Sequence, residues 1–194
     1  MVLTDKKIGF GLTGSHCTYD QVFPVIDKLV ADGADVYPVV SYTVQNVDSR
    51  FGTAAEHLQV LEDKTGHTPV SSIVEAEKFG PANPLDAMVV APLTGNSLSK
   101  LANAITDSPV LMATKATMRN QAPVILAIST NDALGLNGVN IMRLMATKGI
   151  YFVPFGQDNP FNKPNSLIAK MDYLQDTIEA ALENKQFQPV ITTY

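Results

Sequence analysis

The stretch LDAMVVAPLTGNSLSKLA (85–102) passes from an apolar run through a polar turn into a helical pattern. The run LDAMVVA (85–91) is nearly continuous, which is typical of a strand buried on both faces of a sheet. After about residue 97 the apolar residues recur at helical spacing: Leu98, Leu101, Ala102 and Ile105. A buried strand, a short loop and a helix in direct succession indicate one unit of an α/β fold.

The same alternation continues along the whole chain. Strands are predicted at 7–13, 35–41, 71–74, 85–91, 122–129 and 150–155. Helices are predicted at about 20–32, 51–64, 138–149 and 166–185, besides the one after residue 97. This pattern predicts a three-layer, Rossmann-like, doubly wound α/β fold with about six parallel strands in the order 3-2-1-4-5-6. We expect a single domain over residues 1–194 that ends in the helix at about 166–185.

Composition and charge narrow the class of protein. The chain has 194 residues, is 45% hydrophobic and 17% charged, and carries a net charge of −5. Its 14 Lys and Arg residues are scattered, so nucleic acid is not an expected partner. No apolar run is long enough to span a membrane, and the charged start MVLTDKKIGF does not read as a secretory signal. With one cysteine, Cys17, and hence no internal disulfide, a cytoplasmic location is expected.

Histidine placement does not indicate a metal site or a Ser-His-Asp mechanism. His16, His57 and His67 show no ligand spacing with one another or with Cys17, so we expect no metal. His57 lies beside Glu56 in a helical pattern, which favours a solvated helix face for this residue.

Two loops meet at the predicted topological switch point. TGSHCTY (13–19) follows the first strand and PLTGNS (92–97) follows the fourth, and in the predicted order both lie over one crevice. Each loop is rich in hydroxyls and leads into a helix N-terminus, where backbone N–H groups and the helix dipole favour an anion such as phosphate. Either loop alone also fits an ordinary helix cap. Their convergence makes a mononucleotide site an equally strong interpretation.

The residues after the second predicted strand discriminate between nucleotides. GFGLTG (9–14) matches the G-x-G-x-x-G pattern, but that match alone is weak. A dinucleotide site also needs a carboxylate after the second strand, and this position holds Ser41 and Thr43 instead. Hydroxyls there suit a phosphate or a ribityl chain, so FMN is favoured over NAD.

These residues resemble a known family. GLTGS (11–15), Ser41, and APLTGNSLSKLA (91–102) with Asp107 are similar to the homo-oligomeric flavin-containing cysteine decarboxylase superfamily, over the chain to about residue 155. The resemblance implies bound FMN and a trimer-based homo-oligomer with flavin near a subunit interface. Together with Thr43, the matching positions give the cofactor-binding candidates: Thr13, Gly14, Ser15, Ser41, Thr43, Pro92, Thr94 and Asn96.

The chain departs from the decarboxylase pattern at two places. The family's catalytic histidine stands in an H-I pair that is matched here by Ser72-Ile73, with His67 five residues earlier. The family's P-A-M-N loop reads Ser129-Thr130-Asn131, so Asn131 is retained and is a weak catalytic candidate, with helix capping as its alternative role. The resemblance therefore carries the fold and the cofactor further than it carries the reaction, and the catalytic residue stays unknown.

Three further stretches resemble one branch of the superfamily, from spore-forming bacteria: residues 129–138, 153–160 and 163–166. That branch implies an oxidoreductase subunit in the cytoplasm of the sporulating mother cell. It also implies a small dicarboxylate substrate and a second, nucleotide-binding subunit that could hold NAD(P). Lys100, Lys115 and Arg119 are cations that could meet such a substrate, and a solvated helix face is at least as strong an interpretation for Lys115 and Arg119. Two alternatives are an FMN-dependent decarboxylase of a small acid and a non-catalytic scaffold that activates the second subunit.

Overall fold

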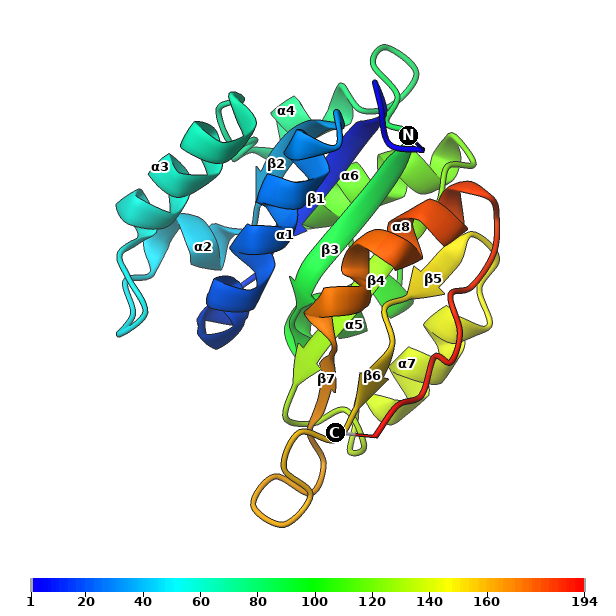
Figure 1. Cartoon of the computed structure of the whole chain (residues 1–194). Coiled ribbons are helices and arrows are strands. Elements are labelled where there is room, and N and C mark those ends of the chain that lie inside the picture. Colours follow the sequence, from blue (N-terminus) through cyan, green and yellow to red (C-terminus); the bar gives the residue numbers. More distant parts are fainter. Residues whose placement is uncertain (1, 194) are drawn as a thin grey trace.

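A computed structural model describes residues 2–193 and shows one sheet flanked by helices on both faces (Figure 1). Its parallel part runs in the order β2-β1-β3-β4-β5. The strands are β1 (Lys7–Leu12), β2 (Asp35–Val40), β3 (Ala87–Leu93), β4 (Val124–Thr130) and β5 (Ile150–Phe152). The predicted Rossmann-like α/β class is confirmed.

The helices form the two outer layers. α1 (Tyr19–Ala31) and α8 (Leu174–Leu182) pack on one face of the sheet. α5 (Gly95–Ala102), α6 (Pro109–Arg119) and α7 (Gly138–Met145) pack on the other. α2 (Tyr42–Asn46), α3 (Ala54–Thr65) and α4 (Ile73–Glu77) lie toward the β2 side of the molecule. No helix among the described residues has the length and apolar character needed to cross a membrane.

The core accounts for the near-continuous apolar run at 85–91. All residues of β3 are buried, because helices cover the sheet on both sides of it. α1 contributes Val22, Ile26 and Leu29, which are fully buried and recur at helical spacing. Because β1, β3 and β4 are parallel neighbours, their carboxyl ends lie at one edge of the sheet, and the loops that follow them gather there.

The strand predicted at 71–74 is wrong. A single parallel bridge between Val39 and Val70 takes the third position, so the order 3-2-1-4-5-6 holds with that bridge in place of a strand. Ser72 instead caps α4, since its hydroxyl accepts from the Glu75 N–H and the Glu75 carboxylate accepts from the Ser72 N–H. This capping box stabilises a helix at the position where a strand was predicted.

Two predictions near the C-terminus also need correction. The strand predicted at 150–155 is two strands, β5 and β6 (Phe155–Gly156). The helix predicted at 166–185 begins as a strand, β7 (Leu167–Ala169), which pairs antiparallel with β4 and β6 and is followed by the 3₁₀ turn η2 (Met171–Tyr173) and α8. Leu167 and Met171 are buried in these elements, so the apolar seam is real although its first part is not helical. The loop between β6 and β7 projects from the body of the molecule (Figure 1).

Candidate functional site

Thr13 joins the two loops that the sequence placed together. Its Oγ1 donates to the Pro92 carbonyl at 2.7 Å and accepts from the Thr94 N–H at 3.0 Å. Thr13 is 1% exposed, and Pro92 is buried in β3. The predicted convergence of the loops is therefore confirmed, but Thr13 and Pro92 stand behind the loop surface and line neither of the cavities described next.

Two cavities adjoin at these loops. The α6-side cavity, of about 300 Å³, includes Ser41, Thr43, Lys100 and Ser108 in its lining. The hairpin-side cavity, of about 380 Å³, includes Ser15, Ser129, Asn131, Asp132 and Lys163. Three residues line both cavities: Gly14, Thr94 and Asn96. Six of the eight cofactor candidates thus face one continuous site.

The α6-side cavity is built to receive an anion. Thr94 caps α5 by accepting from the Ser97 N–H, and Ser108 caps α6 by accepting from the Leu111 N–H, so two positive helix ends border the cavity. The Ser41 hydroxyl is buried, and no described residue gives it a hydrogen bond. A buried polar atom without a partner is costly unless a ligand or water satisfies it. Lys100 adds a cation, although it lies 2.8 Å from Asp107.

Gly14 allows the first loop to lie directly against α2. A Cβ added at Gly14 would lie 2.6 Å from the Thr43 Cγ2, which is closer than two non-bonded carbon atoms approach each other. The absence of a side chain therefore brings the backbone after β1 beside Ser41 and Thr43.

The hairpin-side cavity holds a fixed carboxylate. Asp132 accepts hydrogen bonds from Thr130 and, at 2.8 Å, from Asn137, which is itself buried. This group lies against the first residue of α5, because a Cβ on Gly95 would be 2.7 Å from the Asp132 Oδ1. Asp132 thus places a negative charge beside the positive end of α5 on this side of the site.

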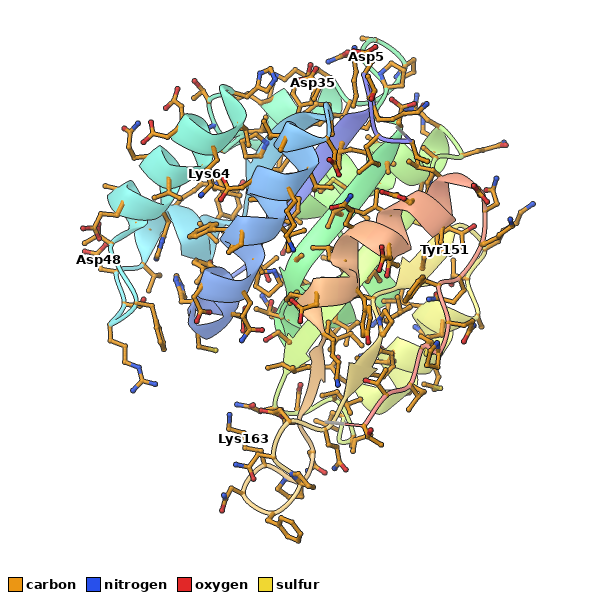
Figure 2. All side chains as sticks on the ribbon, viewed as in Figure 1. Asp5, Asp35, Asp48, Lys64, Tyr151 and Lys163 are labelled. Atoms are coloured by element: carbon orange, nitrogen blue, oxygen red, sulfur yellow. The ribbon has the colours of Figure 1, made fainter. Side chains whose placement is uncertain are left out.

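Other polar groups complete the hairpin-side cavity. The Ser15 and Ser129 hydroxyls lie 2.7 Å apart and connect the first loop to β4. Lys163 stands on the projecting loop between β6 and β7 (Figure 2), 3.6 Å from the Asp158 carboxylate. Asn131 is exposed and lines the cavity, as expected for a residue at the carboxyl end of β4.

Several of these residues escaped prediction from the sequence. Asp132, Ser129 and Lys163 were not among the candidates, although they line the hairpin-side cavity. For Ser129 and Asp132, the usable signal was the polar run at the carboxyl end of β4, the edge where ligands bind in such sheets. No sequence signal placed Lys163, because the antiparallel hairpin that carries it was itself not predicted.

His57 is not on a solvated helix face, so that prediction is wrong. It is 5% exposed and packs edge-on against Tyr19, with ring centroids 4.9 Å apart, and beside His16 at 5.6 Å. His57 shares a helical face with the buried Ala54 and Leu61, which outweighs its neighbour Glu56. Burial lowers the pKa of both His16 and His57, and in His57 the nearby His16 lowers it further.

The other predicted cations and histidines lie elsewhere. Lys115 and Arg119 are exposed on α6 and line neither cavity, so of the three proposed cations Lys100 alone reaches the site. His67 lies 2.6 Å from Asp35, at the amino end of β2 and hence at the opposite edge of the sheet. Ser72 caps α4. Neither His67 nor Ser72 lines a cavity of the site.

Comparison with known proteins places the chain in a family. A profile of the flavoprotein family matches residues 2–183. The chain belongs to the flavoprotein family, which confirms the resemblance read from its two loops.

Within that family the chain is similar to one protein over nearly its full length. It is 64% identical over 189 residues to the B subunit of dipicolinate synthase of Bacillus subtilis (strain 168), covering 97% of this chain and 94% of that protein. The crystal structure of the dipicolinate synthase B subunit from Bacillus halodurans C superposes with a TM-score of 0.92 at 60% identity, covering 100% and 99% of the two chains. The FMN-dependent cysteine decarboxylase SpaF superposes at 0.66 with 18% identity, covering 94% and 98%, which shows a shared fold alone. The branch predicted from the sequence is therefore confirmed.

Proposed function

We propose that this chain binds FMN across the two cavities, with the phosphate in the α6-side cavity. The observation that carries the proposal is the buried Ser41 hydroxyl, which lacks a described partner and faces a cavity bordered by two helix N-termini. Gly14, Thr94 and Asn96 line both cavities, so the ribityl chain would pass over them. The flavin ring would then extend toward the hairpin-side cavity.

Helix ends, rather than side-chain charge, support this direction of binding. Each cavity has one lysine and one carboxylate in its lining: Lys100 and Asp107 on the α6 side, and Lys163 and Asp132 on the hairpin side. The N-termini of both α5 and α6 border the α6-side cavity, whereas the hairpin-side cavity includes residues of α5 and none of α6, and there Asp132 already lies beside Gly95.

The proposed activity is that of the B subunit of a dipicolinate synthase. It acts with the nucleotide-binding A subunit of the synthase, which could hold NAD(P), in oxidising dihydrodipicolinate to dipicolinate in the cytoplasm of the sporulating mother cell. The 64% identity to the Bacillus subtilis protein supports this assignment. We also propose a trimer-based homo-oligomer, because the resemblance to the flavin-containing cysteine decarboxylase superfamily implies one.

The chain's own residues orient the reactants. Bound flavin would supply the acceptor for a hydride. Asn131 and Ser129 offer hydrogen bonds at the carboxyl end of β4, and Lys163 offers a cation that a substrate carboxylate could meet. Asp132 is held by two donors on one side of this cavity, so it would steer a dicarboxylate toward Lys163 by repulsion.

A decarboxylase of a small acid fits the site less well. At the position matched to the decarboxylase histidine the side chain of Ser72 is engaged in capping α4, and His67 pairs with Asp35 at the other edge of the sheet. In a scaffold role, in which the chain activates the nucleotide-binding subunit without using flavin, the buried Ser41 hydroxyl would depend on water for a hydrogen bond.

The absorption spectrum of the purified protein with its partner subunit tests the proposal. We expect flavin bands after FMN is added, and we expect them to bleach when dihydrodipicolinate is supplied without air. Flavin bands that persist unchanged during synthesis of dipicolinate would show that the flavin is not redox-active. Synthesis without any flavin uptake would support the scaffold instead, and carbon dioxide release by this chain alone would support a decarboxylase.

A further inference from the structure

The proposed oxidation releases a proton as well as a hydride, so the site needs a group that accepts the proton. A dihydropyridine ring loses two hydrogens when it becomes aromatic. One hydrogen leaves as a hydride with the electron pair of its bond, and the other leaves as a proton, whose bonding pair completes the aromatic ring. The proton acceptor must be deprotonated at neutral pH and must reach the ring.

The hairpin-side cavity offers one side chain of this kind. Within residues 2–193 its titratable lining residues are Cys17, Asp132 and Lys163, and no histidine is among them. Thiols are mostly protonated at neutral pH and ammonium groups almost completely so, whereas carboxylates are deprotonated. The amide of Asn131 donates and accepts hydrogen bonds but takes up no proton at neutral pH. Asp132 is therefore the candidate that the cavity itself selects.

Two donors orient the Asp132 carboxylate and leave it open to the cavity. Thr130 donates to its Oδ1, and Asn137 donates to its Oδ2 at 2.8 Å. Asn137 is in turn fixed, because it is buried and its amide oxygen accepts from Asn140 at 2.9 Å. A carboxylate can accept about four hydrogen bonds, and Asp132 is exposed, so both of its oxygens keep the capacity to accept a proton.

The two opposite charges of the cavity can also orient the substrate ring. Lys163 comes from the projecting loop between β6 and β7 (Figure 2), whereas Asp132 follows β4 and lies beside Gly95 of α5. In a pyridine-2,6-dicarboxylate the two carboxylates flank the nitrogen, and the ring hydrogens lie on the opposite edge. Attraction to Lys163 and repulsion by Asp132 both turn the carboxylates away from Asp132. The edge that carries the hydrogens then faces Asp132.

We propose that Asp132 is the catalytic residue that accepts the ring proton; this rests on the proposed function, which supplies the substrate and the hydride acceptor. The proton passes from the ring to the Asp132 carboxylate, and its bonding pair stays in the ring and completes the aromatic system. The hydride passes with its two electrons to the flavin of the proposed function. Because Asp132 is exposed, it can release the proton to water after dipicolinate leaves.

Asp132→Asn tests the proposal with little change of structure. The amide oxygen can accept from Asn137, and the amide NH₂ group can donate to the Thr130 hydroxyl. With FMN and the partner subunit at saturation and without air, we expect dihydrodipicolinate to bleach the flavin at least about a hundredfold more slowly than in the unchanged protein. Stopped-flow absorption measures this rate.

Binding of dipicolinate gives a readout that involves no turnover. The product is a dianion, so loss of the Asp132 charge should tighten its binding several-fold, both with and without FMN. Isothermal titration calorimetry measures the two affinities. A variant that binds the product more tightly and reacts more slowly separates proton transfer from damage to the site, because damage weakens binding as well.

Two control variants separate the carboxylate from its surroundings. Thr130→Val removes one donor to Asp132 but keeps the carboxylate, so bleaching should slow by less than about tenfold. Asp172→Asn removes the same charge at an exposed position of η2 that lines neither cavity, and it should match the unchanged protein in both measurements.

Equal bleaching rates in Asp132→Asn and the unchanged protein would overturn the proposal. Dipicolinate binding that is unchanged or weaker in Asp132→Asn would overturn it too, because the carboxylate would then not face the ligand. Equal slowing in Asp132→Asn and Thr130→Val would assign Asp132 to the structure of its loop, with the same consequence. Failure of the proposed function shows differently, as an absence of bleaching in the unchanged protein, and the assignment of Asp132 falls with it.

Discussion

Thr13 and Asn96 lie in the two loops of the site, but their side chains have different tasks. Thr13 is committed to the Pro92 carbonyl and the Thr94 N–H, so it holds the loops together. Asn96 is exposed and lines both cavities, where it can meet a ligand. A change at Asn96 therefore tests ligand binding with little effect on the scaffold.

Asn96→Asp should weaken FMN binding, because it adds a negative charge beside the proposed phosphate and ribityl positions. We expect a loss of affinity of about tenfold, equivalent to about 1.4 kcal/mol. Asn103→Asp makes the same change just beyond the other end of α5 and serves as the control. Fluorescence titration with FMN measures both. Equal affinities in the two variants would show that the site is misplaced.

Among single residues of the site, the sequence predicted the hydroxyl and amide side chains better than the charged side chains. Gly14, Ser15, Ser41, Thr43, Thr94 and Asn96 line the cavities as expected of loops at the switch point. Asp132 escaped prediction because its position depends on contacts with Thr130, Asn137 and Gly95, which come together only in the folded chain. The burial of His57 likewise depends on how α3 packs against α1.

The helices α5 and α6 give the site its preference for an anion. Their N-termini border the same cavity, and the Ser41 hydroxyl faces it. Hydrogen bonds to a charged group contribute about 1.5–3 kcal/mol each. The phosphate should therefore contribute much of the flavin affinity.

Riboflavin, which lacks the phosphate, should bind at least about tenfold more weakly than FMN. Ser41→Ala should lower FMN affinity several-fold and leave riboflavin affinity unchanged, because the hydroxyl is assigned to the phosphate. Competition titrations with the two flavins measure both effects. Equal binding of FMN and riboflavin would place the phosphate outside the α6-side cavity.

Element prediction succeeded where one periodic signal dominated and failed where two signals competed. β3 and α1 follow directly from an apolar run and a helical repeat. The start of α4 competed with a strand at 71–74, and the capping pair Ser72 and Glu75 decided the outcome. In β7, pairing with β4 outweighs the helical spacing of Leu167 and Met171.

For the whole molecule, the buried His57 and the half-buried His16 make stability depend on pH. Burial lowers the pKa of His16 and His57 below the ordinary value of 6.5 in the folded protein, while the unfolded chain keeps that value. Below pH 6.5 the unfolded state therefore binds more protons, and the free energy of unfolding decreases as the pH falls, by at most about 1.4 kcal/mol per pH unit for each histidine.

Urea unfolding at pH 7.5, 6.5 and 5.5 should show this decrease, and His57→Phe should reduce it, since a phenyl ring keeps the packing against Tyr19 without a titrating group. Carboxylates titrate mainly below this range, so they contribute little to the difference between the two proteins. An identical pH slope in both proteins would contradict a buried, neutral His57.

The hydrogen bond from Thr13 to Pro92 closes a loop of chain between residues 79 positions apart. A ligand that touches Gly14 in one loop and Asn96 in the other would span the same closure and act as a reversible cross-link between distant parts of the sequence. Unfolding of either part would then require release of the ligand, so loss of the flavin signal and loss of the fold should occur together. Flavin would in this way slow the unfolding of the protein as well as serve its reaction.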